Sequence, residues 1–429
     1  MDAEVIVVGG GIAGLACGKC LHEGRVPFLI LEASDSIGGR LKTDRVEGFL
    51  LDHGFQVLQT AYPEAQRILN YRSLALCPFA PGAEVRLGGR FCRVADPLRG
   101  PRFALDTLVA PVGSLGDKIR VLRLVHRLCQ MNADDLFRQP EVSALDFLQR
   151  EGFSERIIEA FFKPFFGGVC LDPEIGASSR VLQYVFWVLA RGDAALPSQG
   201  IGSIPAQLAT EIPEGRVRTR NRVQRIDRRQ VVLESGEKLT CRAVVVATEG
   251  PEAERLLATG KPSGSRSVCC LYYGAPEPPM QEKLIVLNGE GTGPISNLSV
   301  VSNVAPTYAP PGQALVAVTV LNHGQENMEA LSSAAGDQLR DWYGRQTRRW
   351  RLLKTYRIRH GLPWQRPPTP NPMRVDPRAR RGIYFCGEHR SVPSIQWAML
   401  SGRKAAEAYM KDRGTKENID EAGHGPQKG

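Results

Sequence analysis

The residues of this chain best suited to chemistry are glycines near the N-terminus. They stand between an apolar run, Glu4–Val8, and a segment predicted as a helix, Ile12–Glu23. In a nucleotide-binding turn of this kind Gly9 allows the tight bend, Gly11 lets a pyrophosphate approach the backbone, and Gly14 permits close packing of helix and strand. The amides and the dipole at the helix start then hold the phosphates. The residues assigned to this turn are Gly9, Gly11, Ile12, Ala13 and Gly14.

An acidic residue follows the turn at the distance expected for ribose binding. Glu32 ends the predicted strand Phe28–Glu32, eighteen residues after Gly14. At that position a carboxylate accepts hydrogen bonds from ribose hydroxyls. This favours NAD or FAD over NADP, and the turn alone does not distinguish NAD from FAD. A glycine-rich turn without a ligand is the alternative.

Other catalytic patterns are missing or weak. The seven histidines include no HxH or HExxH pattern, so no metal site is predicted. The sequence also lacks a P-loop and a GxSxG nucleophile elbow. Cys17 and Cys20 form a C-x-x-C pair inside the first predicted helix, where core packing is favoured over redox chemistry. His53, His360 and His389 lie near motifs, but a lone histidine is usually structural, and the catalytic side chains remain unknown.

Strand and helix patterns of the nucleotide-binding type recur at the start, the middle and the end of the chain. The intervening part is rich in helical periods such as Ser154–Phe162, and a last helix is predicted over Gln396–Lys411. We therefore predict an α/β fold in which a Rossmann-like domain is built from three sequence pieces and carries an inserted α+β substrate domain. The predicted boundaries are 1–60, 200–260 and 360–412 for the nucleotide-binding domain, 61–199 and 261–359 for the substrate domain, and 413–429 for a disordered tail.

Composition places the chain among globular proteins. Hydrophobic residues make up 42% and charged residues 23% of 429 residues, which suits two or three domains with ordinary cores. The longest strongly apolar runs have about ten residues, whereas a membrane span needs about twenty. The N-terminus shows no signal-peptide pattern, and the ten cysteines show no disulfide-framework spacing. These features predict a cytoplasmic protein.

The excess of basic residues is mostly arginine. The net charge is +10, and arginines gather in Arg216–Arg229, Arg340–Arg359 and Arg374–Arg381. A solvated face is the first interpretation, and attraction to anionic lipid or to an anionic substrate is the second. Nucleic acid is not expected as a partner, because no binding module accompanies these charges. Peripheral membrane contact through Arg216–Arg229 stays an open alternative, and the oligomeric state is not predicted.

The segment after the turn carries a family resemblance. Glu32 opens the string Glu-Ala-Ser-Asp-Ser-Ile-Gly-Gly-Arg, which leads to Gly-Phe-Leu-Leu-Asp-His-Gly over 48–54. This pattern resembles the flavin-containing amine oxidoreductase superfamily, which includes monoamine and polyamine oxidases, protoporphyrinogen oxidase and phytoene-desaturase-like enzymes. The resemblance implies FAD as the cofactor, with Arg40 as a bidentate clamp on its pyrophosphate. The site residues expected here are Glu32, Ala33, Gly39 and Arg40.

Two later segments resemble the same superfamily in the same order. Arg222–Ile226 leads to a predicted strand, and the resemblance implies that Val223 meets the adenine end through its backbone; an ordinary core valine is the alternative. Near the C-terminus Glu388 is expected beside the ribityl–phosphate part. The helix starting near Gln396 is expected to direct its amides at the isoalloxazine and to favour the anionic reduced flavin. The site residues expected here are Val223, Gly387, Glu388, Gln396, Ala398 and Met399.

Departures from the superfamily narrow the expected chemistry. No cysteine follows Cys386, so FAD is expected to bind non-covalently. Neither an active-site lysine nor a pair of aromatic residues framing the flavin can be assigned, which weakens the amine-oxidase interpretation. Trp364, Tyr384 and Trp397 are single aromatic candidates.

A phenylalanine-rich stretch is the candidate wall of a substrate pocket. Four phenylalanines occur within 161–166, and this region together with 197–200 looks more like the desaturase relatives. These rings line a cavity for a small apolar substrate, or else they belong to the core. We expect an FAD-dependent oxidoreductase that takes a hydride from an isoprenoid- or tetrapyrrole-like substrate. The alternatives are a flavin amine oxidase that uses oxygen and a non-catalytic FAD-binding assembly protein.

Overall fold

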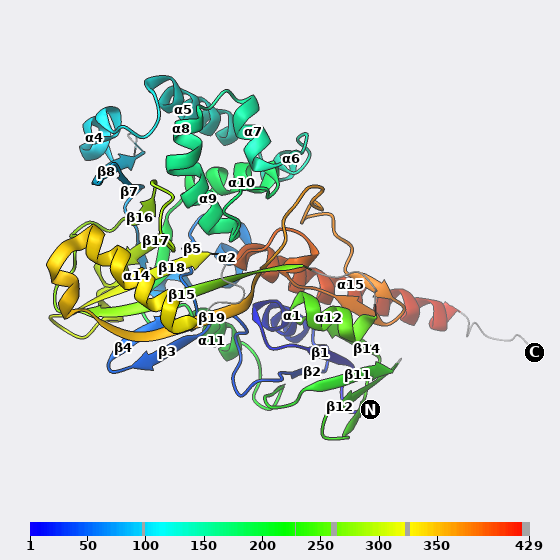
Figure 1. Cartoon of the computed structure of the whole chain (residues 1–429). Coiled ribbons are helices and arrows are strands. Elements are labelled where there is room, and N and C mark those ends of the chain that lie inside the picture. Colours follow the sequence, from blue (N-terminus) through cyan, green and yellow to red (C-terminus); the bar gives the residue numbers. More distant parts are fainter. Residues whose placement is uncertain (97–98, 228, 259–263, 322–326, 423–429) are drawn as a thin grey trace, which may run out of the picture.

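Two large sheets of different type organise the molecule. The computed structural model describes residues 1–96, 99–227, 229–258, 264–321 and 327–422. One sheet has six strands and is mostly parallel, and the other has seven strands and is mostly antiparallel. Figure 1 shows a layer of helices at the top of the molecule and the six-stranded sheet at the opposite end. The predicted mixed α/β class is confirmed.

The six-stranded sheet brings together strands from distant parts of the chain. Val5 pairs with Phe28 on one side and with Ala243 on the other, and Val244 pairs with Ile383. These central strands are short apolar runs that are covered on both faces, as is usual for parallel sheets. In spatial order the strands are β10 (Val217–Arg218), β2 (Phe28–Leu31), β1 (Val5–Val8), β14 (Ala243–Val246), β21 (Ile383–Phe385) and β20 (Arg378–Arg380).

Helices and a small sheet cover the two faces of this sheet. One face packs on α1 (Ile12–Glu23), α11 (Ser203–Thr210) and α15 (Ile395–Ala422). A Cβ at Gly402 of α15 would lie 2.0 Å from the carbonyl oxygen of Ala13 in α1, so glycine is needed where these helices cross. The other face packs on α12 (Gly250–Leu257) and on the sheet of β11 (Val223–Asp227), β12 (Gln230–Leu233) and β13 (Lys238–Thr240).

The seven-stranded sheet forms a second body. Its long strands are antiparallel, and β16 and β7 form a parallel pair. Helix α14 (Met328–Tyr343) covers one face. In spatial order the strands are β19 (Arg351–Pro363), β15 (Ser265–Ala275), β18 (Ala314–Leu321), β17 (Ile295–Val300), β16 (Ile285–Asn288), β7 (Gly82–Leu87) and β8 (Arg90–Ala95).

Smaller elements join the two sheets. The hairpin of β3 and β4 lies below β19 in Figure 1, and the short strands β5, β9 and β6 form a sheet of their own. The bounds of these elements are β3 (Thr43–Val46), β4 (Phe49–Asp52), β5 (Leu58–Gln59), α2 (Pro63–Ile68), α3 (Tyr71–Leu74), β6 (Leu76–Pro78), β9 (Ala194–Pro197) and α13 (Val301–Val304).

The helical layer occupies much of the segment between β8 and β9. It consists of α4 (Ala104–Val109), α5 (Leu115–Cys129), α6 (Ala133–Leu136), α7 (Ala144–Arg150), α8 (Glu155–Ile157), α9 (Lys163–Cys170) and α10 (Ser179–Leu189). The helix predicted over Ser154–Phe162 differs in the structure, because 158–162 form a π-helical turn between α8 and α9. Such turns are rare, and they occur frequently at functional sites. This bulge carries Phe161 and Phe162.

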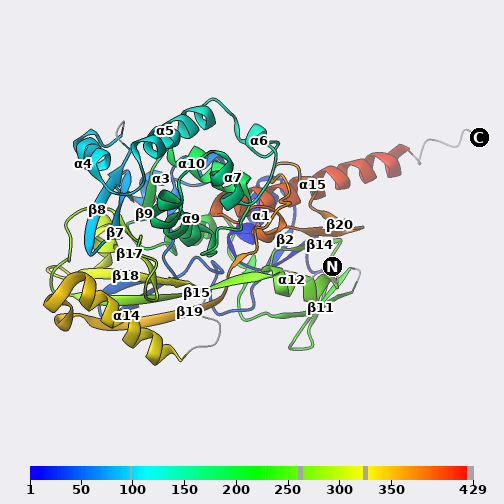
Figure 2. The ribbon, with the colours of Figure 1, turned by 45° about the horizontal axis from the view of Figure 1, so that its top comes forward.

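The C-terminal helix departs from the predicted disordered tail at 413–429. Helix α15 continues to Ala422 and projects from the body in Figures 1 and 2. The segment 412–422 contains no proline, and its residues include the good helix formers Lys416, Glu417, Glu421 and Ala422. Residues 423–429 lie outside the described part. Within the described residues, no helix has the length and hydrophobicity required to cross a bilayer.

Candidate dinucleotide site

The glycine turn between β1 and α1 has the geometry that its spacing predicts. Gly9 adopts a φ of +111°, and a Cβ there would lie 2.7 Å from the carbonyl oxygen of Ala247 in the neighbouring strand connection. A Cβ at Gly14 would lie 1.9 Å from the carbonyl oxygen of Gly9. Both positions therefore exclude any larger side chain. The turn is closed and rigid at these two points.

Gly11 differs from Gly9 and Gly14 because the space that a side chain would occupy there is open. A Cβ at Gly11 would approach only the Cα of Gly39, at 3.9 Å. The amide of Gly38 donates to the carbonyl oxygen of Gly10 at 2.9 Å, and this bond holds the second glycine turn against the first. Gly11 is also the N-cap of α1 and gives the helix no side-chain cap. The first amides of α1, at Ile12 and Ala13, thus adjoin an open glycine cradle, which fits an anionic pyrophosphate.

Glu32 lies at the end of β2 directly beside this cradle. Its Oε2 accepts a hydrogen bond from the amide of Gly10 at 2.7 Å, and its Oε1 accepts from the amide and hydroxyl of Ser34 at 2.8 Å each. The carboxylate is therefore fixed in direction, and its Oε2 keeps a further lone pair. Ala33 lies between these partners in the same turn. The predicted ribose contacts of Glu32 and Ala33 stay predictions.

Arg40 and Glu388, which were predicted from opposite ends of the chain, meet in the structure. They form an ion pair, and Arg40 Nη1 also donates to the carbonyl oxygen of Gly361 at 2.7 Å. The amide of Gly387, which has a φ of +130°, donates to Ser401 Oγ of α15 at 2.9 Å. These bonds place the third motif beside the second. Arg40 thus lies beside the third motif, and its role as a pyrophosphate clamp stays a prediction.

Positive charge and unpaired polar atoms gather around this ion pair. Burial, together with the charges of Arg390 and Arg40, lowers the pKa of His389 to about 4. Among the described residues, His389 Nε2 and Arg390 Nε are buried without a hydrogen-bond partner, and so is Trp397 Nε1 at the start of α15. Buried polar atoms of this kind need a partner, which a bound ligand can supply. Together with the glycine cradle, this environment fits a phosphate-bearing dinucleotide.

The start of α15 is packed more tightly than the sequence indicated. Gln396 is buried, and its Oε1 accepts from the amide of Glu64 at 2.8 Å. Ala398 and Met399 are also buried, in the core shared with α1. Trp397 lies in an aromatic cluster with Phe137 and Tyr184. The roles of Gln396, Ala398 and Met399 towards a cofactor stay predictions, and the structure assigns these side chains a packing role.

Val223 lies in the core, as the alternative interpretation stated. It is 3% exposed, and its carbonyl oxygen accepts from Arg255 Nη2 at 2.9 Å. The adenine contact is not excluded by this bond, because a carbonyl oxygen has two lone pairs. Arg255 was not singled out in the sequence. Its position in α12 gave no local signal.

A second polar cluster was missed by sequence reasoning. Asp44 accepts from Lys354 Nζ at 2.5 Å and from the Tyr356 hydroxyl at 2.7 Å, and His53 Nε2 lies 3.0 Å from its other oxygen. Burial opposes ionisation, but these hydrogen bonds hold the pKa of Asp44 well below its usual range. The partners come from the β3–β4 hairpin and from β19. No local spacing connects positions so far apart in the chain.

Asp52, the last residue of β4, is deeply buried. Its carboxylate accepts from Thr43 Oγ1 at 2.6 Å, from the Ile201 amide at 3.0 Å and from the Tyr308 hydroxyl at 2.8 Å. Burial nevertheless raises the pKa of Asp52 to about 6. Asp52 thus links the β3–β4 hairpin to Ile201, which precedes α11, and to Tyr308. Its role is positional, because three protein donors occupy its oxygens.

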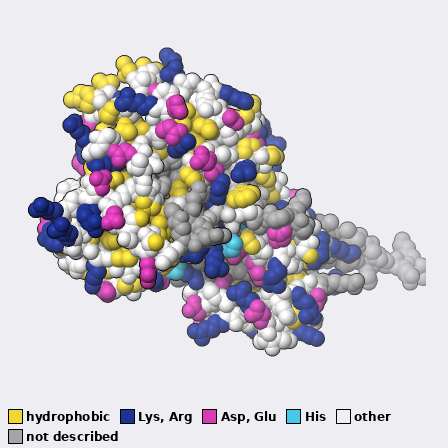
Figure 3. Space-filling view, viewed as in Figure 1, with side chains coloured by type: hydrophobic (Ala, Val, Ile, Leu, Met, Phe, Trp, Pro, Cys, Tyr) yellow, Lys and Arg dark blue, Asp and Glu magenta, His cyan; other side chains and the backbone are white. Residues whose placement is uncertain are grey.

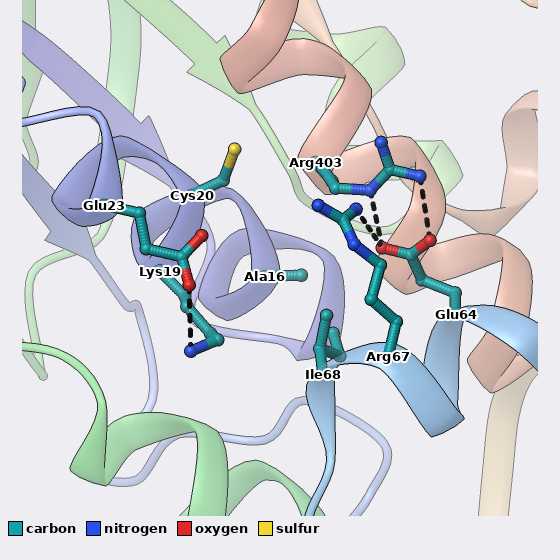
Figure 4. A pocket seen from close by; sticks show the side chains of 8 residues that line it. All are labelled: Ala16, Lys19, Cys20, Glu23, Glu64, Arg67, Ile68 and Arg403. Atoms are coloured by element: carbon teal, nitrogen blue, oxygen red, sulfur yellow. Dashed lines mark hydrogen bonds and ion pairs between the residues drawn. The ribbon is translucent and has the colours of Figure 1, made fainter.

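An ion pair fixes α15 to α2, next to the polar side of α1. Arg403 donates to both oxygens of Glu64 at 2.6 and 2.8 Å, and Lys19 pairs with Glu23 at 3.1 Å (Figure 4). These residues line a cavity of about 130 Å³ together with Cys20. Burial raises the pKa of Cys20 to about 11, so this thiol is a poor nucleophile. Among the described residues, no His, Cys, Asp and Glu side chains gather as a metal site.

Comparisons with known proteins agree with this geometry. A family profile described as flavin containing amine oxidoreductase matches residues 12–410. Among curated proteins, the carotenoid phi-ring synthase of Streptomyces griseus is 26% identical over 337 residues, which cover 69% of this chain and 64% of that protein. Protoporphyrinogen oxidase 2 of Arabidopsis thaliana is 25% identical over 48% of this chain and 40% of that protein. The chain thus spans less than two thirds of these relatives.

Solved structures share the whole fold at low identity. A putative protoporphyrinogen oxidase from Exiguobacterium sp. 255-15 has 16% identity and a TM-score of 0.73, and the match covers 96% of this chain and 99% of that one. Cyclohexylamine oxidase from Brevibacterium oxydans IH-35A has 17% identity and a TM-score of 0.69, with the same coverage. At these identities the likeness is one of fold.

Proposed function

The chain belongs to the flavin-containing amine oxidoreductases, and from this premise we propose that it oxidises an apolar, isoprenoid- or tetrapyrrole-like substrate with non-covalently bound FAD. The resemblance inferred from the motifs is confirmed, and the protein is an FAD-dependent oxidoreductase. The substrate class and the mode of FAD attachment are our proposals. When bound, the flavin supplies the hydride acceptor.

The six-stranded sheet and its helices are proposed as the FAD domain. Its central strands come from the three pieces 1–60, 200–260 and 360–412, and the remaining body between them would hold the substrate. The first amides of α1 and the Arg40 guanidinium would bind the pyrophosphate, and Glu32 would accept from the ribose. Cys386, which lies nearest the third motif, is fully buried, and burial raises its thiol pKa to about 12. A thiol of this kind supports non-covalent binding.

The observation that carries the substrate proposal is an aromatic-rich hydrophobic core that extends from the helical layer to the start of α15. Phe161 and Phe165 stack at 5.5 Å and are half-buried, and Phe165 contacts Phe186 of α10. A second aromatic group in the same hydrophobic core reaches Trp397 at the start of α15 through Tyr184, with ring centroids 5.2 Å apart. Phe162 and Phe166, in contrast, are core residues. An apolar wall of this type suits a polyene or a porphyrinogen, because a charged amine would lose its hydration there.

An anaerobic titration followed by visible spectroscopy tests this proposal. FAD-loaded protein is mixed in turn with polyenes, porphyrinogens and amines, and the flavin absorbance band is recorded. We expect bleaching by a polyene or a porphyrinogen. Bleaching by amines alone would instead establish the amine-oxidase alternative, and a flavin that none of them reduces would favour the assembly-protein alternative.

A matched pair of variants links that reduction to the aromatic wall. Phe165→Ala removes a half-buried ring from the wall and is expected to slow flavin reduction by the apolar substrate at least about tenfold. Leu352→Ala, at a position 41% exposed on β19, removes a surface side chain outside the cluster and is expected to leave the rate unchanged. Equal rates in both variants would show that the substrate does not contact this wall.

A further inference from the structure

Exposed aliphatic side chains are concentrated on one part of the helical layer. Six large hydrophobic side chains that are 42–70% exposed fall within a stretch of eighteen residues. Figure 3 shows hydrophobic side chains gathered at the top of the molecule, where α4 and α5 lie. We call this surface the α4–α5 face. Its six residues are Leu105, Leu108, Val109, Leu115, Ile119 and Leu122.

Hydrogen bonds hold α4 in a position that leaves its aliphatic side chains exposed. Helix α4 has no buried residue, yet it is anchored, because Lys118 Nζ donates to the carbonyl oxygens of Leu108 and Ala110 at 2.7 and 2.8 Å. Thr107 Oγ1 also accepts from the amide of Ala95 in β8 at 2.9 Å. The aliphatic side chains of α4 are therefore held towards solvent by specific hydrogen bonds. A contiguous apolar surface of this kind marks an interaction site.

Helix α5 is amphipathic in an unusual way, because it has two apolar faces. Leu124 and Leu128 are buried in the core of the helical layer. On the opposite side, Leu115, Ile119 and Leu122 follow the spacing of one helix face and are exposed. The first apolar face packs in the core of the helical layer. The other has no partner among the described residues.

Arginines border the exposed apolar strip. Arg120, Arg123 and Arg127 follow one another along the adjoining side of α5, and Arg102 precedes α4. The side chains of Arg102 and Arg127 are 68% and 52% exposed, and they pair with Glu282 at 3.3 Å and with Glu151 at 2.6 Å. An aliphatic strip flanked by basic residues is the pattern of a helix that lies in the interface of a membrane. The basic border complements anionic headgroups.

We propose that the α4–α5 face docks the protein on an anionic lipid membrane. The aliphatic side chains would enter the acyl region while the arginines contact the headgroups. The face has no aromatic member, whereas the energetic centres of protein–protein interfaces are enriched in Trp and Tyr. This inference does not depend on the proposed substrate, although it would bring the aromatic wall close to any lipid-dissolved molecule.

The surface considered earlier, Arg216–Arg229, is a weaker membrane candidate. It lies around β10 and the β11–β12 hairpin, at the opposite end of the molecule from α5 in Figures 1 and 2. Acidic partners accompany its arginines: Arg218 pairs with Glu237 at 3.1 Å and Arg225 with Asp227 at 2.8 Å. Such pairs also occur at the α4–α5 face, so the difference lies in the hydrophobic side chains: large exposed ones are not found around Arg216–Arg229 among the described residues.

Vesicle co-sedimentation of the FAD-loaded full chain tests the proposal. We expect binding to phosphatidylcholine vesicles that contain phosphatidylserine, and weaker binding when salt is raised or phosphatidylserine is omitted. Leu115→Ser with Ile119→Ser is expected to lower the affinity about tenfold to a hundredfold, because two aliphatic anchors are lost. Arg120→Glu with Arg123→Glu is expected to lower it at least about thirtyfold on anionic vesicles.

Matched control variants identify the surface. Leu352→Ser and the pair Arg345→Glu with Arg348→Glu make the same chemical changes at exposed positions of β19 and the turn before it, and they are expected to leave binding unchanged. Flavin content and the rate of reduction by detergent-solubilised substrate should be unchanged in all variants, which separates this test from that of the proposed function.

Three outcomes would overturn the proposal. The first is a wild-type protein that does not bind anionic vesicles. The second is binding that survives the α4–α5 substitutions but is lost when Arg220 and Arg222 are changed to Glu. The third is a wild-type protein that forms a dimer in sedimentation, does not bind vesicles, and becomes a monomer when Leu115→Ser is combined with Ile119→Ser. In that case a second copy of the chain would cover this face.

Discussion

Replacing Gly11 with alanine separates cofactor binding from folding. A Cβ at Gly11 would lie 3.9 Å from the Cα of Gly39, which is ordinary van der Waals contact, so the protein can accept the methyl group. The same methyl group enters the cradle in which a pyrophosphate would approach the backbone. Displacing the phosphates would weaken about two charge-assisted hydrogen bonds, each worth about 1.5–3 kcal/mol. The expected loss of FAD affinity is therefore about 3–6 kcal/mol, or roughly a hundredfold to ten-thousandfold.

The assay compares the apoprotein with the FAD-loaded protein. FAD titration by fluorescence gives the affinity, and thermal unfolding gives the stability with and without FAD. For apo Gly11→Ala we expect a loss of at most about 1 kcal/mol, because alanine is a poorer N-cap than glycine. Added FAD should raise the melting temperature of the wild type and leave that of the variant nearly unchanged.

Two further glycine variants serve as a control and as a contrast to Gly11→Ala. Gly336→Ala lies within α14, where no atom lies within 4 Å of the new Cβ, and it should stabilise the protein by about 1 kcal/mol without changing FAD affinity. Gly14→Ala should fail to fold normally, because its Cβ would overlap the Gly9 carbonyl oxygen. Wild-type FAD affinity in Gly11→Ala would refute the assignment of the cradle.

Further predictions concern two buried titratable groups and the arginine clamp. The folded-state pKa of Asp52 is raised to about 6, so its contribution to the free energy of unfolding is present below about pH 4 and is lost as the pH rises to 6. The folded-state pKa of His389 is lowered to about 4, so its contribution to the free energy of unfolding is lost as the pH falls from 6.5 to 4. Each contribution is about 3 kcal/mol, and the two oppose each other. The free energy of unfolding of the apoprotein is measured in urea between pH 4 and 6.5. On acidification it should fall more steeply in Asp52→Asn than in the wild type, whereas in His389→Gln it should rise. If both variants have the same pH dependence as the wild type, both assignments are wrong. Arg40→Lys should raise the dissociation constant of FAD at least about tenfold by fluorescence titration, since an ammonium cannot form the forked contact, and an unchanged constant would exclude the clamp.

The sequence predicted best where structure depends on neighbouring residues. Helix α1 begins at Ile12 and ends at Glu23, as expected from the glycine turn before it and the apolar pattern within it. Glu32 and the glycines of the turn also occupy the expected places, because β1, the turn and β2 are consecutive. The ion pair of Arg40 with Glu388 brings together residues that had been assigned to one cofactor by family resemblance alone.

Features that depend on distant partners could not be predicted. The strand β19 and the cluster of Asp44 with Lys354 and Tyr356 result from the packing of a hairpin against residues about three hundred positions later. The π-helical turn at 158–162 arises within a segment whose apolar period indicated an ordinary helix. The burial of Gln396 likewise follows from its bond to the backbone of α2, which no spacing reveals.

The order of strands in the six-stranded sheet has a consequence for biosynthesis. Strand β1 leaves the ribosome first, but its partner β14 follows only near residue 243, and β21 closes the next edge near residue 383. Until then the nascent chain exposes unpaired apolar strand edges, which are prone to aggregation. Closing such long loops also makes folding slow. A translation stop before residue 383 would therefore leave β14 without its β21 partner and the sheet unfinished.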